Sequence, residues 1–81
     1  MVFLITSLDG YNSFCAFADD SSPVWLSADA LPEAKLEELR TSRHSVSVFN
    51  YPIPPTDYEL LTDAIETIKE HHPNQPVWVQ L

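Results

Sequence analysis

The sequence predicts an α/β domain, with an α+β arrangement as the alternative. Three observations favour it: an apolar run rich in β-formers near the N-terminus, an amphipathic helical pattern after residue 56, and strand-like stretches between the helical segments. The 81 residues suffice for one hydrophobic core, and 44 % of them are hydrophobic. We therefore expect residues 1–81 to form a single small globular domain.

About five segments are expected to form a mixed sheet. Residues 2–6, VFLIT, form a continuous apolar run that is typical of a strand buried on both faces. Asp9-Gly10 is a turn signal, and Gly10 is the one position where a positive φ costs little. Residues 13–18 are therefore predicted to be a second strand, in a hairpin with the first. The remaining predicted strands are residues 24–27, 45–50 and 76–81.

Two helices are predicted to pack on this sheet. The first covers residues 29–41, with Asp29 as its N-cap. The second covers residues 56–72, where Thr56 and Glu59 form a capping box. Its core stripe consists of apolar residues at three-to-four spacing, namely Tyr58, Leu61, Ile65 and Ile68. The predicted order is therefore strand–strand–strand–helix–strand–helix–strand.

The charge balance excludes several classes of partner. Twelve acids stand against four bases, for a formal net charge of −8, so the chain cannot neutralise phosphates and we expect no direct nucleic-acid binding. An anionic membrane surface is disfavoured for the same reason. The opening MVFLITSLDG has no basic region and too short an apolar run for a signal peptide or a membrane span. With a single cysteine and no internal disulfide, a cytoplasmic protein is expected.

The residues form no recognisable catalytic or metal-binding motif. Cys15 lies between Phe14 and Phe17 in a predicted strand, where a small buried side chain is expected. On a helix His71 and His72 would point about 100° apart and would not easily share a metal ion. We therefore expect no catalytic residue, no metal and no cofactor. A small enzyme is the third hypothesis, with a site at the strand ends formed by Tyr11, His44, Asn50 and Tyr51.

The second predicted helix carries a row of four carboxylates along one side, from Glu59, Asp63, Glu66 and Glu70. Like charges at this spacing cost a helix roughly a few tenths of a kcal/mol per pair. The row is either a solvated face or a surface held for a basic protein partner. The leading hypothesis is a small protein-binding module: an inhibitor, an immunity- or antitoxin-like protein, or an accessory subunit. Further contacts are predicted from the first helix and the proline-rich loop YPIPPT, at Glu37, Glu38, Tyr51 and Ile53.

An alternative hypothesis is a homo-oligomeric structural protein. If both helices lay on one side of the sheet, the other face would be open and apolar. The two tryptophans, Trp25 and Trp78, would then pair one copy of the sheet with another. In that case the negative charge would serve only to keep the oligomer soluble.

Overall fold

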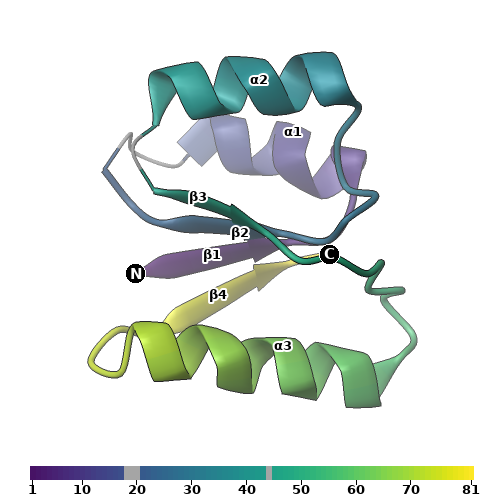
Figure 1. The fold of residues 1–81 in the computed structure, drawn as a ribbon, viewed down its shortest axis with the longest axis vertical. Coiled ribbons are helices and arrows are strands. Elements are labelled where there is room, and N and C mark those ends of the chain that lie inside the picture. The colour runs from purple at the N-terminus through teal and green to yellow at the C-terminus, as the bar shows by residue number, and fades with distance from the viewer. Residues whose placement is uncertain (18–20, 44) are drawn as a thin grey trace.

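The computed structural model, which describes residues 1–17, 21–43 and 45–81, contains a parallel sheet between two layers of helix (Figure 1). Within these residues the strands are β1 (Val2–Ile5), β2 (Val24–Leu26), β3 (Val46–Val48) and β4 (Val77–Gln80), in the order β3-β2-β1-β4. The helices are α1 (Leu8–Phe17), α2 (Glu33–Ser42) and α3 (Tyr58–His71). Helices α1 and α2 cover one face of the sheet and α3 covers the other (Figure 1). The predicted α/β class and the single compact domain are confirmed.

The predicted hairpin at the N-terminus is wrong. Residues 13–17 belong to helix α1, and β1 and β2 pair in parallel, an arrangement that needs a crossover rather than a tight turn. The described strands therefore form an all-parallel sheet of four strands with three helices, rather than a mixed sheet of about five with two. Gly10 lies in the first turn of α1 and has no positive φ. A short apolar run does not distinguish a strand from a helix, and in the folded chain Tyr11 and Phe14 pack from one side of α1 into the core.

Both remaining helices begin later than predicted. Helix α2 starts at Glu33 with Pro32 as its N-cap, and the Asp29 carboxylate instead accepts a hydrogen bond from the Ser27 hydroxyl at 3.0 Å. Helix α3 is capped by Asp57, whose Oδ1 accepts from the Leu60 amide at 3.1 Å. The predicted Thr56–Glu59 capping box is therefore replaced by an aspartate cap one residue later, because carboxylates accept amide hydrogen bonds at least as well as hydroxyls there.

The hydrophobic core divides into two clusters, one on each face of the sheet. Strand β1 contributes to both, because its alternate residues point to opposite faces. Phe3 and Ile5 pack beneath α1 and α2, and Val2 and Leu4 pack against α3. All four side chains are buried, which confirms the prediction of a strand covered on both sides.

The segment between β3 and α3 crosses from the edge of the sheet to the α3 layer. It has no regular secondary structure, as its prolines predict, and the Tyr51 carbonyl accepts from the Ala28 amide at 3.0 Å. Ile53 anchors the loop in the core beside Ala64 and Ile68. Among the described residues no helix is both long and apolar enough to cross a membrane.

Candidate functional site

The carboxylate row predicted from the sequence lies on the exposed side of α3. At about 100° of rotation per residue, positions 59, 63, 66 and 70 fall within about 60° of one another. The buried residues of the helix, Ala64 and Ile68, lie on the opposite side. The four acidic side chains are all exposed, so the helical periodicity correctly places the row away from the core. We call Tyr58 and these four acids the α3 surface, comprising Tyr58, Glu59, Asp63, Glu66 and Glu70.

The carboxylates of this row have no partner within the part of the chain that the structure describes. Among the described residues none of the four accepts a hydrogen bond or forms an ion pair. The only lysine or arginine on the same helix is Lys69. Because each carboxylate is exposed and makes no hydrogen bond or ion pair to another described residue, a partner cation would not have to break such a contact.

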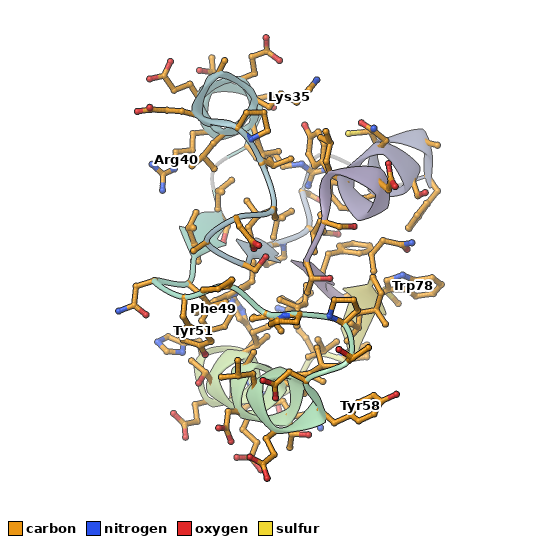
Figure 2. The ribbon with its side chains drawn as sticks, turned by 90° about the vertical axis from the view of Figure 1, so that its right-hand side faces the viewer. Lys35, Arg40, Phe49, Tyr51, Tyr58 and Trp78 are labelled. Atoms are coloured by element: carbon orange, nitrogen blue, oxygen red, sulfur yellow. The ribbon has the colours of Figure 1, made fainter. Side chains whose placement is uncertain are left out.

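A shallow, open hollow of about 450 Å³ lies over the first turns of α3. It is lined by Tyr58, Glu59, Thr62 and Asp63. Tyr58 is 73 % exposed, and its ring points away from the body of the molecule (Figure 2). This corrects the prediction that Tyr58 belongs to the core stripe: residue 58 is the first of the helix, and its side chain is exposed rather than packed in the core. The acidic row therefore has an aromatic ring at its N-terminal end.

The second predicted acidic patch lies at the other end of the molecule. Glu37 and Glu38 are exposed on α2, on the opposite face of the sheet from α3 (Figure 1). The same helix carries Lys35 and Arg40, which project from the end of the domain remote from Tyr58 (Figure 2). Glu37 and Glu38 thus cannot join the α3 surface in one continuous contact, and bases partly neutralise them.

The two predicted contacts from the proline-rich loop are drawn into the fold. Ile53 is only 1 % exposed and belongs to the core cluster beneath α3, so its side chain is not presented to a partner. Tyr51 is half-buried, with its ring centroid 5.3 Å from that of Phe49. We therefore leave both residues out of the α3 surface.

The residues proposed for an enzyme site are not brought together. Tyr11 faces the α1–α2 layer, near Glu38 and Arg43, whereas Tyr51 packs in the cluster on the α3 side. Asn50 is exposed, and His44 lies outside the described residues. Tyr11 and Tyr51 thus lie on opposite faces of the sheet, and the described members of this set form no common site.

In a parallel sheet, ligands commonly bind where the strand order reverses, which is here at the carboxyl ends of β1 and β4. That position is filled by the chain itself. The Ser7 hydroxyl accepts from the Gly10 amide at 3.0 Å and donates to the Leu81 carbonyl at 3.3 Å. The Gln80 and Leu81 carbonyls lie so close to Gly10 that an added Cβ would meet them at 2.9 and 3.2 Å. The first turn of α1 is therefore closed off by the end of β4.

The two tryptophans lie on opposite faces of the sheet, because Trp25 pairs in register with Leu4 and Trp78 with Phe3. Trp25 is partly buried on the α3 side, where its indole N–H donates to His72 Nε2 at 3.3 Å and its ring lies 5.3 Å from that of His71. No local sequence pattern predicts this bond, because it joins residues 47 apart. Trp78 is the one that reaches solvent, at 45 % exposure.

Arg43 is a further residue that the sequence analysis did not identify. Arg43 is only 8 % exposed, and its guanidinium lies 4.7 Å from the centroid of the Phe14 ring. Nη1 donates to the Ser22 carbonyl at 3.0 Å. The aromatic contact and the backbone hydrogen bond explain how the fold accommodates a buried cation, and indicate a structural role.

Cys15 is exposed on α1 rather than buried in a strand, and its thiol is free. It affects its neighbour one helical turn earlier. Burial, followed by a hydrogen bond with Cys15, raises the pKa of Tyr11 to about 12. Electrostatic interactions with Cys15 and Glu38 act in the same direction, and Arg43 opposes them. The folded chain therefore favours the neutral phenol.

This shift predicts a loss of folding stability at alkaline pH that depends on Tyr11. The raised pKa contributes stability that is complete below the ordinary value of 10.0 and is lost as the pH rises towards about 12. Urea unfolding of the wild type should lose more free energy between pH 10 and pH 12 than that of Tyr11→Phe. Tyrosinate absorbance should show a late component that Tyr11→Phe lacks and Tyr58→Phe retains. Equal pH slopes for the wild type and Tyr11→Phe would contradict the assignment.

Among the described residues no group of three or more His, Cys, Asp or Glu side chains is arranged to hold a metal ion. Comparison of the chain with protein-family models, with curated proteins and with solved structures finds no match.

Proposed function

We propose that this protein is a small binding module whose α3 surface docks on a Lys/Arg-rich surface of another protein. It would act as an inhibitor, as an immunity- or antitoxin-like protein, or as an accessory subunit, and not as an enzyme. One observation carries the proposal: four exposed carboxylates share one side of a helix and have no internal partner among the described residues. A phosphate backbone would be repelled by such a surface, whereas basic side chains would be attracted to it.

The exposed ring of Tyr58 gives the surface a second means of recognising a cation. Guanidinium and ammonium groups stack on aromatic faces, and tyrosine is enriched among the residues that dominate binding energy at interfaces. Beside the ring, the hollow lined by Glu59, Thr62 and Asp63 leaves room for a side chain from the partner. A lysine or arginine there would contact the ring and be close to two carboxylates.

The distribution of charge favours an oriented approach. Three of the four bases, Lys35, Arg40 and Arg43, belong to α2 or follow it directly, on the far side of the sheet from α3. The field of the domain is therefore most negative over α3. A basic partner would be steered towards this end, with an association rate that falls as salt screens the attraction.

The proposal places the protein in the cytoplasm. Its one cysteine is a free thiol exposed on α1, which suits a reducing compartment. If the thiol has no part in binding, a Cys15→Ala variant should bind the basic partner as well as the wild type does.

Neutralising the row should abolish partner capture. The test variant is Glu59→Gln/Asp63→Asn/Glu66→Gln/Glu70→Gln, which keeps the Asp57 cap and all side-chain sizes. The matched control is Glu33→Gln/Glu37→Gln/Glu38→Gln on α2. Each protein is immobilised, exposed to lysate of the native host at low and at high salt, and the retained proteins are quantified by mass spectrometry. We expect a basic protein that the wild type and the α2 control retain at low salt only, and that the α3 variant does not retain.

Thermal melting separates this role from a structural one. Removing like charges at three- and four-residue spacing should leave helix stability unchanged or raise it by roughly 0.2–0.5 kcal/mol per pair. A lower melting temperature for the α3 variant would mean that the row serves the fold. Retention of the same proteins by all three forms, or retention of none at either salt level, would contradict the binding proposal.

A further inference from the structure

Strand β4 presents a free edge of unpaired backbone groups. Among the described strands it is the last of the sheet and pairs only with β1. The carbonyls of Pro76 and Gln80 accept from β1, from the amides of Val2 and Thr6 at 2.9 and 3.3 Å. Because alternate residues of a parallel strand bond to the same neighbour, the N–H and C=O groups of Val77 and Val79 point away from β1. These groups are the ones that a further strand would bind.

This edge lacks the features that usually prevent pairing. Edge strands are commonly protected by charged side chains, by bulges or by proline, but residues 74–81 carry no charge and the one proline nearby, Pro76, precedes the strand. The α1 helix beside it carries a single charged residue, Asp9. Although the chain has a net charge of −8 and the acidic helix α3 packs on the other face of β4, two copies can approach on the α1 side of this edge without bringing carboxylates together.

An apolar aromatic pair lies next to the free edge. Trp78 and Phe17 are 45 % and 52 % exposed, with their ring centroids 5.7 Å apart. Figure 2 shows Trp78 projecting from the side of the molecule. Its indole N–H donates to Gln80 Oε1 at 3.0 Å, so the polar atom is already satisfied and the ring can be covered at little cost. Apolar side chains and free backbone groups thus occur together.

We propose that β4 pairs with β4 of a second copy of the chain, antiparallel about a two-fold axis that passes beside Trp78. In this register Val77 exchanges both its backbone groups with Val79 of the partner subunit, and the reverse pair follows by symmetry. Trp78 then faces Trp78 of the partner subunit in the closer, non-hydrogen-bonded position, where cross-strand aromatic pairs contact best. The two sheets become one continuous sheet, with both Phe17 rings flanking the pair.

A second copy fits this edge better than an unrelated strand, because the free backbone groups of one β4 strand complement those of the other. The outward groups of Val77 and Val79 are equally spaced about residue 78, so the two-fold operation pairs every free donor with a free acceptor. The contact is uncharged, and salt should strengthen it slightly by screening repulsion between acidic subunits. Salt should have the opposite effect on capture by the α3 surface, so the two proposals are independent and fail separately.

Hydrogen exchange tests the pairing directly. The Val77 and Val79 amides should exchange rapidly in dilute protein and slowly in concentrated protein, as NMR would show residue by residue. The Trp78 and Gln80 amides, which face β1, serve as internal controls and should stay protected at all concentrations. Sedimentation equilibrium over the same range should show a monomer–dimer equilibrium. A monomer at the highest attainable concentration, or a dimer in which Val77 and Val79 still exchange rapidly, would overturn the proposal.

Substitutions at the edge provide the second test. Trp78→Lys would place like charges directly opposite each other and should weaken the dimer about tenfold or more. Val79→Pro removes one outward donor without touching the bonds to β1, and should also weaken it. Trp78→Phe should retain the dimer, and Arg40→Ala, on the side of the domain opposite Trp78 in Figure 2, should leave it unchanged. Melting by circular dichroism confirms that each variant is folded. Equal dimer affinity for Trp78→Lys and wild type would place any dimer on another surface and overturn the proposal.

Discussion

Replacing Phe14 by alanine is expected to remove about 3–5 kcal/mol from the free energy of unfolding. The ring is 1 % exposed and lies at the centre of the cluster beneath α1 and α2. Its centroid is 5.0 Å from that of Phe3 and 6.2 Å from that of Tyr11. The Arg43 guanidinium lies over the same ring at 4.7 Å, so the substitution also leaves a buried cation without its aromatic contact.

The loss should be a large part of the stability of the domain. At roughly 0.05–0.15 kcal/mol per residue, a chain of 81 residues has about 4–12 kcal/mol in total. We therefore expect Phe14→Ala to be largely unfolded in mild urea, as judged by far-ultraviolet circular dichroism. Phe14→Leu, which keeps most of the volume, should lose less than half as much free energy.

Phe17 supplies the matched control, because it lies on the same helix three residues later and is 52 % exposed. Phe17→Ala should cost about 1 kcal/mol or less, since little apolar area is returned to water. Equal losses for the two variants would mean that the α1 layer does not form the core that the structure describes. A Phe14→Ala protein as stable as the wild type would contradict this packing outright.

The same helix shows where sequence reasoning fails. Residues 13–17 contain two phenylalanines and a cysteine, which suit a strand as well as a helix, and Asp9-Gly10 resembles a hairpin turn. The deciding fact is that β1 and β2 are parallel, and this depends on contacts between distant residues. By contrast, α3 was predictable because its long amphipathic pattern fixes both its buried and its exposed side.

For the candidate site, too, the local helical pattern was predictable and the long-range arrangement was not. The carboxylates of Glu59, Asp63, Glu66 and Glu70 are exposed on one side of α3, as their spacing indicates. Their separation from Glu37 and Glu38 follows from which face of the sheet each helix covers, a property of the crossovers rather than of local sequence. The opposite placement of Trp25 and Trp78 likewise depends on strand register, which no single segment specifies.

Gly10→Ala is expected to destabilise the domain by about 1–3 kcal/mol, against the usual trend for a helical glycine. Two effects oppose each other at this position. Alanine favours a helix interior over glycine by about 1 kcal/mol, which would stabilise α1. The added Cβ, however, would meet the Gln80 carbonyl at 2.9 Å and the Leu81 carbonyl at 3.2 Å, distances that backbone atoms can relieve only by moving the end of β4.

That movement disturbs contacts on which the sheet depends. The Gln80 carbonyl accepts from the Thr6 amide at 3.3 Å, and Ser7 Oγ, which caps the Gly10 amide, would also lie 3.2 Å from the new methyl group. Asn12 is exposed on the same helix. Asn12→Ala should therefore gain the higher helix propensity of alanine without a clash, and its free energy of unfolding should rise. Urea unfolding of the two variants should therefore give shifts of opposite sign. If both variants were stabilised, the close approach of α1 to β4 would be refuted, because the single glycine of the chain would then be dispensable where α1 approaches the Gln80 and Leu81 carbonyls.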